Sequence, residues 1–282
     1  PVAVISAGWQ EAEGDIDDIR EVIGRPLEDL RLYHRAEDVF ARDPGLAEAY
    51  RARQDRLREQ QRLYRLRLRQ LAIAAEHTLQ AEGDADTVAA EQRHAIAQLR
   101  ALDRHHLTRT EVIHAEFSGQ YDAVAHGLLA DHAQAIEEQI GAASAVLITG
   151  GNVVVLHNRM RLFDVPRMLG TAHVIAWSAG SMALAGRIVL FHDRAPEGPR
   201  EPEVLGAGGG LLRKHVILPD TNRRLLKGDC LRMSLMSRRF SPDTSVVLDS
   251  GAELLFANER PVQGKGAKRL NRNGRVVGIA TK

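Results

Sequence analysis

Two short apolar runs that both end in small residues constrain this chain more than any other feature. Residues 145–149 (Ala-Val-Leu-Ile-Thr) are typical of a strand buried on both faces, and residues 150–152 (Gly-Gly-Asn) follow directly. Residues 173–177 form a second run, which leads into residues 178–180 (Ser-Ala-Gly). Residues 153–169 fit a crossover helix, so we predict a right-handed βαβ unit within an α/β fold whose sheet is mostly parallel.

Ser178 stands where the second run ends, and we identify it as the candidate nucleophile. A Ser at such a strand-to-helix turn is held in a sharp bend with its oxygen exposed above the sheet, an arrangement called a nucleophile elbow. The small neighbours Ala179 and Gly180 suit so tight a turn, whereas Trp177 departs from the glycine that usually leads the motif.

The loop after the first run supplies candidate substrate contacts. Paired glycines let the backbone approach a ligand closely, so the N–H groups of Gly151 and Ala179 form a chemically sensible oxyanion pair. Gly150 lies beside them as a further candidate contact with the oxyanion or the substrate, and Asn152 is a candidate for holding a substrate carbonyl or carboxylate.

A Gly-Gly-Asn after one strand, followed by a helix and a strand ending in Trp-Ser-Ala-Gly, resembles the dipeptidase E and cyanophycinase family of serine peptidases. The resemblance covers residues 121–282 together with the first strand and helix. Residues 244–249, 250–255 and 274–280 are similar to the family's later strand, its acidic hairpin and its closing strand. The resemblance therefore implies the class I glutamine amidotransferase-like fold, a mostly parallel sheet sandwiched by helices, interrupted here by a long helical hairpin.

The resemblance also implies an activity, hydrolysis of short peptides that are acidic or isopeptide-linked, and nothing in the sequence selects among these substrates. A glutamine amidotransferase would carry a Cys at the elbow, whereas the single Cys230 lies elsewhere. We expect no cofactor. The glycines of residues 206–210 argue against a dinucleotide site, because they precede a strand instead of joining a strand to a helix. We expect no metal either, since the histidines lack the spacing of metal ligands.

The rest of a catalytic triad is harder to assign. The family carries its acid near Asp193, but its catalytic His would fall at Asp220 or the residue after it. Three alternatives stay open: His215, His192 or His173 supplies the base, Asp220 does so as a carboxylate, or hydrolysis has been lost. His215 begins its predicted strand, so it would need a register shift to reach the other end.

A rival hypothesis follows from the missing His. The protein would then keep the elbow but act as a binding or scaffold protein through its helical arm. The discriminating observation is an imidazole nitrogen within hydrogen-bond distance of the Ser178 oxygen, about 2.6–3.2 Å.

The charge balance and the hydropathy of the chain limit the classes of partner and the cell compartment that we expect. Lys and Arg number 38 against 37 Asp and Glu, which favours neither a membrane nor a nucleic-acid partner. No run of eighteen apolar residues occurs, and residues 1–8 are typical of a first β-strand. The single Cys agrees with a reducing compartment, so we expect a cytoplasmic protein.

We divide the chain into the first strand and helix (residues 1–26), a helical insertion (27–120) and the remainder of the α/β core with the elbow (121–282). Within the insertion, residues 46–82 and 86–107 are predicted to form an antiparallel hairpin.

Along the first helix of this hairpin, large residues recur every seven positions, a spacing that keeps a seam facing a partner helix. They are Tyr50, Leu57, Tyr64 and Leu71. The partner is the second arm, the domain surface or another subunit, and we expect self-packing or a homodimer.

The same helix carries eight arginines between residues 51 and 69 against two acidic residues. Without interleaved base-stacking aromatics, this pattern favours a solvated face over nucleic-acid binding. The arginines are Arg51, Arg53, Arg56, Arg58, Arg62, Arg65, Arg67 and Arg69.

Overall fold

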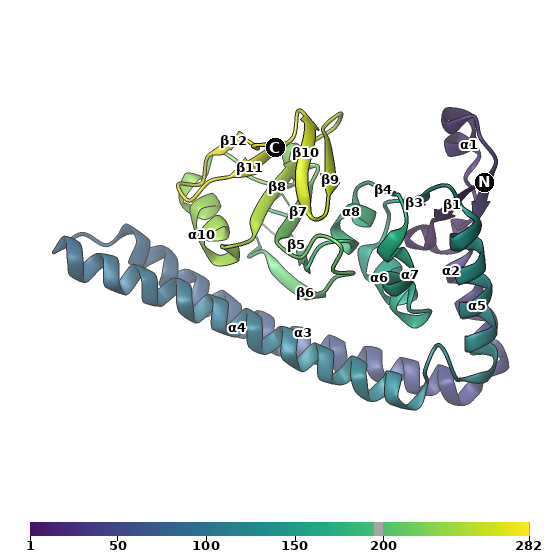
Figure 1. Ribbon diagram of the computed structural model, residues 1–282. Helices are drawn as coiled ribbons and strands as arrows, with labels where there is room; N and C mark the ends of the chain where they lie inside the picture. Colours follow the sequence, from purple (N-terminus) through teal and green to yellow (C-terminus); the bar gives the residue numbers. More distant parts are fainter. Residues whose placement is uncertain (195–199, 282) are drawn as a thin grey trace. The chain divides into compact units, whose positions relative to one another are not determined.

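Two four-stranded sheets and a long helical hairpin make up the computed structural model, which describes residues 1–194 and 200–281 (Figure 1). Contacts between Cα atoms divide the chain into two units. Unit 1 consists of Pro1–Arg56, Val112–Leu184 and Gly208–Leu211. Unit 2 consists of Leu57–Glu111, Ala185–Ala207 and Leu212–Lys282. The predicted mixed α/β class, with a parallel sheet and a long helical region, is confirmed.

The sheet of unit 1 is wholly parallel, in the order β2-β1-β3-β4. Its strands are β1 (Val2–Ile5), β2 (Leu27–Asp29), β3 (Val146–Ile148) and β4 (Val174–Ala176). Ile5 pairs with Ile148, which in turn pairs with Ala176, so the loops after these three strands leave the sheet at one edge. This arrangement contains the predicted βαβ unit, in which β3 and β4 are neighbours.

The helices of unit 1 fill the connections between its parallel strands or follow the last of these strands. They are η1 (Ala7–Ala12), α1 (Asp17–Ile23), α2 (Leu32–Arg42), α5 (Gly127–Ala142), α6 (Val153–Leu162), α7 (Val165–Met168), η2 (Leu169–Thr171) and α8 (Ala179–Ala183). One core cluster joins Val2, Val4 and Leu147 of the strands to Ile16, which precedes α1. The buried strand residues therefore anchor the loops that carry the candidate site.

Unit 2 contains a mixed sheet in the order β12-β11-β8-β7, in which β7 and β8 are parallel and the other neighbours are antiparallel. Two antiparallel hairpins, β5–β6 and β9–β10, accompany it. The elements are β5 (Arg187–Leu190), β6 (Glu203–Ala207), β7 (His215–Pro219), α9 (Thr221–Arg224), α10 (Cys230–Phe240), β8 (Thr244–Leu248), β9 (Glu253–Ala257), β10 (Arg260–Lys265), β11 (Lys268–Leu270) and β12 (Val276–Gly278).

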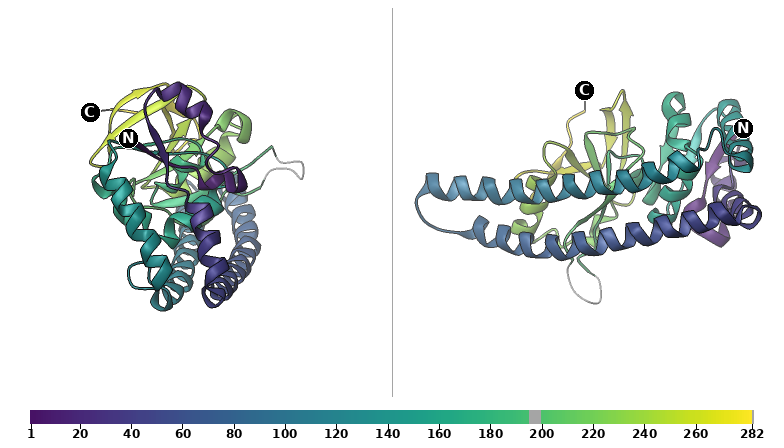
Figure 2. Two further views of the ribbon diagram at one scale, coloured as in Figure 1. Left: turned by 90° about the vertical axis from the view of Figure 1, so that its right-hand side faces the viewer. Right: turned by 90° about the horizontal axis from the view of Figure 1, so that it is seen from below.

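The hairpin consists of α3 (Pro44–Gln80) and α4 (Ala85–Gln120), which run side by side in Figure 2. The second helix continues past the predicted end at residue 107, because residues 108–120 contain no Pro and only one Gly. The predicted seam faces this second arm: Tyr64 stacks on His106 at 4.1 Å, and Tyr50 packs on Phe117 at 6.0 Å.

Residues 27–120 are not helical throughout, since they also contain β2, which pairs with β1. Across residues 1–194 and 200–281, no helix combines the length and the apolar character needed to cross a membrane. The dimer predicted for the arm stays a prediction.

Candidate functional site

The backbone of Ser178 has a conformation that a non-glycine residue rarely adopts. Its φ is 50° and its ψ is −123°, and it lies directly between β4 and α8. Positive φ costs free energy for any residue with a Cβ, and a ψ this far from the left-handed helical region adds to the cost. Unit 1 therefore contains the sharp strand-to-helix turn that the sequence predicted at this serine.

Short hydrogen bonds hold this turn in place. The carbonyl oxygen of Ser178 accepts from the Ser181 hydroxyl at 2.7 Å and from the Met182 N–H at 3.2 Å. Trp177 donates its N–H to the carbonyl of Ile148 on the neighbouring strand at 3.2 Å. The side chain of Ser178 itself is half-buried and takes part in none of these bonds.

Three glycines allow the loops around Ser178 to approach one another closely. A Cβ on Gly150 would lie 3.1 Å from the Ser178 Oγ, so this glycine packs directly against the candidate nucleophile. A Cβ on Gly180 would lie 2.3 Å from the carbonyl oxygen of Ile148, and Gly151 has φ +99°. The glycines recognised in the sequence thus meet a steric requirement at one edge of the sheet.

The two N–H groups assigned to an oxyanion pair are available. Within the described part of unit 1, neither Gly151 nor Ala179 donates its backbone N–H to a protein acceptor. Asn152, by contrast, uses its side-chain oxygen to cap α6, accepting from the N–H groups of Val154 and Val155 at 3.0 and 3.2 Å. Asn152 therefore positions the loop, and only its amide nitrogen is left for a substrate.

The loop after β1 also belongs to this edge of the sheet, which the sequence interpretation missed. The carbonyl of Gly8 accepts the Asn152 N–H at 2.7 Å, and a Cβ on Gly8 would lie 2.4 Å from the Gly150 carbonyl oxygen. Gln10 follows with φ 60° and ψ −121°, nearly the conformation of Ser178. The available signal was the run Ser-Ala-Gly at residues 6–8, small residues directly after a strand.

His173 belongs to the same unit as the nucleophile but stands at the other end of its strand. It directly precedes β4, whereas Ser178 follows that strand. In the described part of unit 1, the Ser178 Oγ forms no hydrogen bond with any side chain. His173 is therefore not placed to act as the general base for Ser178.

Asp193, the candidate orienting acid, is engaged elsewhere in unit 2. Its buried carboxylate accepts the Arg232 Nε–H at 2.9 Å with one oxygen and the Leu226 N–H at 3.0 Å with the other. Burial opposes the charge on Arg232, but Glu201 and Asp193 outweigh it and raise the pKa of Arg232. A histidine oriented by Asp193 would have to share the carboxylate with this ion pair.

The two candidate histidines of unit 2 have opposite surroundings. His215 is buried, its ring lies edge-on to Phe256 at 4.9 Å, and its Nδ1 has no hydrogen-bond partner in the described part of unit 2. Burial lowers the pKa of His215, which favours the neutral form. His192 is exposed and follows β5. The His215 side chain fits a packing role, whereas that of His192 is open to solvent.

As the sequence predicted, His215 and Asp220 lie at opposite ends of one strand. His215 is the first residue of β7, and Asp220 follows Pro219, its last, so about 16 Å of extended backbone separates His215 from Asp220. Asp220 has φ 53° and is the residue directly before α9. Its carboxylate lies 4.0 Å from Arg223, at the surface of unit 2.

A polar cluster that the sequence did not indicate lies beside Asp220. Asp249, just after β8, accepts from the Thr221 hydroxyl and the Asn222 N–H, both at 2.8 Å, and from Lys227 Nζ at 3.0 Å. Burial would raise the pKa of Asp249, but these donors outweigh it and the pKa is lowered. The carboxylate is therefore ionised and links the segments that follow the parallel strands β7 and β8.

No set of three or more His, Cys, Asp or Glu side chains is arranged to hold a metal ion in the described ranges 1–194 and 200–281. Comparisons of the chain with protein-family models, with curated proteins and with solved structures gave no match. The resemblance to the dipeptidase E and cyanophycinase family consequently rests on the motifs in the sequence alone.

Proposed function

We propose that the protein is a serine-type hydrolase that cleaves short peptides or isopeptides, with Ser178 as its nucleophile. The observation that carries this proposal is the Ser178 backbone, with φ 50° and ψ −123° at a strand-to-helix turn. Strain of this kind costs about 1–3 kcal/mol and persists mainly where it serves a function. Serine nucleophiles of α/β hydrolases occupy such a turn, because it exposes the oxygen and leaves adjacent N–H groups free.

The chemistry assigned to each group is that of acyl transfer. Ser178 Oγ attacks the carbonyl carbon of the scissile bond while a general base takes its proton. The N–H groups of Gly151 and Ala179 stabilise the negative oxygen of the tetrahedral intermediate. The amine leaves with the proton from the base. Water then attacks the acyl carbon and gives a proton to the same base, which passes it to Ser178 Oγ as the carboxylic acid is released.

The class I glutamine amidotransferase-like fold is part of the same proposal. It is supported by the parallel order β2-β1-β3-β4, with the elbow directly after β4 and the glycine loop after β3. A cytoplasmic location also stays a proposal, supported by the single cysteine.

Variants have to identify the residue that acts as the general base. His192 is favoured by its local surroundings, because its ring is exposed, whereas the ring of His215 is buried. Asp193 already holds Arg232, so its substitution would disturb unit 2 whether or not it orients a histidine.

Hydrolysis of defined peptides tests the proposal. The purified protein would be incubated with aspartyl-leucine and with its β-linked isopeptide, and free leucine would be measured by mass spectrometry. We expect cleavage of at least one substrate by the wild type and a loss of at least about a thousandfold in Ser178→Ala. Ser118→Ala, which alters an exposed serine of α4 in unit 1, serves as the matched control and should keep the wild-type rate.

A binding or scaffold protein is the second candidate, and it is favoured by the ion pair that occupies Asp193. It predicts that the wild type cleaves neither peptide. A rate that is equal in the wild type and Ser178→Ala would exclude Ser178 as the nucleophile.

A further inference from the structure

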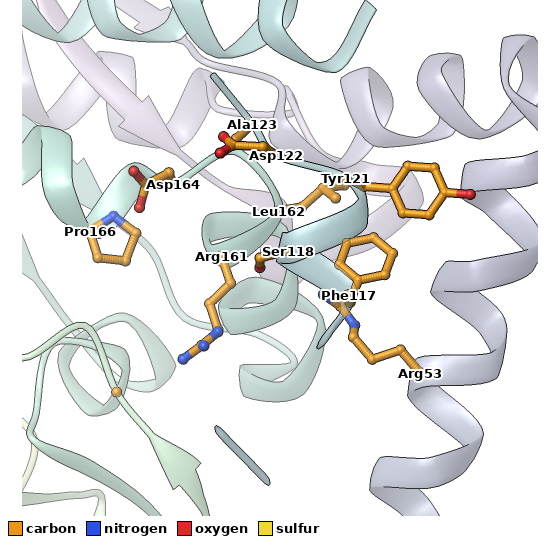
Figure 3. A pocket seen from close by; sticks show the side chains of 11 residues that line it. Arg53, Phe117, Ser118, Tyr121, Asp122, Ala123, Arg161, Leu162, Asp164 and Pro166 are labelled. Atoms are coloured by element: carbon orange, nitrogen blue, oxygen red, sulfur yellow. The ribbon is translucent and has the colours of Figure 1, made fainter. Parts of the chain in front are cut away.

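A pocket of about 380 Å³ lies within unit 1, and Figure 3 shows the side chains that line it. None of the lining residues belongs to the elbow. Its wall includes Arg53 of α3, Phe117 and Ser118 of α4, and Arg161 of α6. The turn after α4 contributes Tyr121. This volume is large enough for a small organic molecule. Aromatic walls together with two guanidinium groups would suit a ligand that carries negative charge.

Arg53 is the unusual member of this wall. The sequence placed it on a solvated face, but only 4 % of its surface is exposed, which corrects that prediction. Its guanidinium carbon lies 4.5 Å from the ring centre of Tyr50 and 4.2 Å from that of Phe117. The two rings explain why an arginine can be buried at this position.

The rings do not satisfy the hydrogen-bonding capacity of Arg53. Its Nε and Nη2 atoms are buried and have no hydrogen-bond partner among residues 1–194 and 200–281. Buried N–H donors without an acceptor are rare, because each costs the free energy of the hydration that it loses. An arginine in this state at the wall of a pocket indicates that a partner is missing.

The charges around Arg53 are mainly positive. Burial, together with Arg161 and Arg159, lowers the pKa of Arg53 to about 10, so its guanidinium stays charged at neutral pH. Burial also lowers the pKa of His114 to about 2 and that of His157 to about 3, so these two rings are neutral there.

The acidic groups nearby are engaged with other partners. Glu37 binds Arg159 at 2.6 Å, and Asp164, on the pocket wall, accepts from Arg167 at 2.8 Å. Asp122, also on the wall, accepts the Val124 N–H at 2.7 Å. None of these bonds brings a carboxylate to the unpartnered nitrogens of Arg53.

We propose that this pocket binds a small molecule bearing an oxyanion, a phosphate or carboxylate group, which Arg53 and Arg161 hold. Both groups present oxygens that match the planar guanidinium, and such charge-assisted hydrogen bonds are the strong ones. The aromatic rings of Phe117 and Tyr121 would line the rest of the ligand. The site does not depend on the hydrolase proposal, because none of its lining residues belongs to the elbow.

Isothermal titration calorimetry with two probes, inorganic phosphate and acetate, tests this proposal. Each titration is made at constant ionic strength set with sodium chloride. We expect saturable binding of at least one probe by the wild type, and the probe that binds identifies the charged group of the ligand. Arg53→Met should weaken this binding at least tenfold.

Two further variants separate the proposed site from other causes. Arg51→Met removes an exposed arginine from the same helix and should leave binding unchanged, which controls for the net charge. Ser118→Trp fills the pocket from an exposed helix position and should abolish binding with both arginines present, even if Arg53→Met fails to fold. No saturable binding by the wild type, or equal affinity in the wild type and Ser118→Trp, would overturn the proposal.

Discussion

Ser178 and Gln10 share a backbone conformation that L-residues avoid, and both follow strands of the same parallel sheet. Their φ values are 50° and 60°, with ψ values of −123° and −121°. Each such residue costs about 1–3 kcal/mol, so the surrounding structure has to impose it. Two contacts hold Ser178 in this conformation. Gly150 packs against its side chain, and the Ser181 hydroxyl donates a hydrogen bond to its carbonyl oxygen.

Replacement of Ser178 by glycine or alanine should measure this strain. Glycine tolerates positive φ, whereas alanine keeps the Cβ that is penalised. We expect Ser178→Gly to be more stable than Ser178→Ala by about 1 kcal/mol. Glycine relieves the backbone strain, and the greater entropy of its unfolded chain offsets part of this gain. Urea denaturation of both variants gives the difference, and greater stability of the alanine variant would show that the turn is not strained.

Gly180 offers a second test at the scale of single atoms. A Cβ there would meet the Ile148 carbonyl oxygen at 2.3 Å and that of Thr149 at 2.6 Å, so Gly180→Ala should destabilise the protein by about 1–3 kcal/mol. Gly141→Ala is the matched control, since it lies in α5 with no atom near its added Cβ and should stabilise the protein by about 0.5–1 kcal/mol. Equal unfolding midpoints for the two variants would refute the close approach.

At the scale of elements, a buried polar cluster joins the hairpin to the rest of unit 2. Arg239 of α10 donates to both oxygens of Asp103 on α4, at 2.7 and 2.8 Å. The Tyr64 hydroxyl of α3 donates to Asp103 at 2.9 Å and accepts from Arg239 at 2.7 Å. Three charged and polar side chains, Arg239, Asp103 and Tyr64, are thus paired inside unit 2, and the Val204 N–H also donates to the Tyr64 hydroxyl at 3.1 Å.

Breaking this cluster should cost far more than breaking a surface pair of the hairpin. Asp103→Asn leaves the Arg239 guanidinium buried without a counter-charge, and we expect a loss of about 3–5 kcal/mol in the free energy of unfolding. Glu59→Gln removes the exposed pair with Arg62 and should change the unfolding midpoint little. Similar effects of the two substitutions in urea denaturation would contradict the structural role of the cluster.

The sequence predicted elements better than it predicted contacts between them. Strands β3, β4 and β8 and the hairpin were recognised, because apolar runs and Gly-free stretches are local signals. The burial of Arg53 was not, since it depends on Phe117, which is sixty-four positions away on the second arm. The ion pair of Asp193 with Arg232 was missed for the same reason.

At the scale of the whole molecule, buried histidines tie stability to pH. In the unfolded chain an imidazole titrates near pH 6.5, whereas burial lowers the pKa of His114 to about 2 and that of His157 to about 3. The unfolded state therefore takes up protons below pH 6.5 that the folded state does not. The stability that these rings provide is present above pH 6.5 and is lost as the pH falls towards about 3.

His114→Leu should make this acid dependence shallower. Between about pH 4 and pH 6 the variant lacks one group that protonates only on unfolding, so the slope of its unfolding free energy against pH should be smaller by up to about 1.4 kcal/mol per pH unit. Urea denaturation at several pH values measures both slopes. Buried Glu13, whose pKa is raised by burial, acts in the opposite direction in both proteins and does not affect the difference. Identical slopes would contradict the neutral state of His114.

Covalent labelling with a serine-directed reagent shows whether Ser178 is an activated nucleophile. The wild type, Ser178→Ala and Ser118→Ala would be treated with a fluorophosphonate, and their intact masses would be measured. We expect a single phosphonyl adduct on the wild type and Ser118→Ala and none on Ser178→Ala, because only an activated serine attacks the reagent. An unlabelled wild type, or an adduct that persists in Ser178→Ala, would show that Ser178 is not the nucleophile.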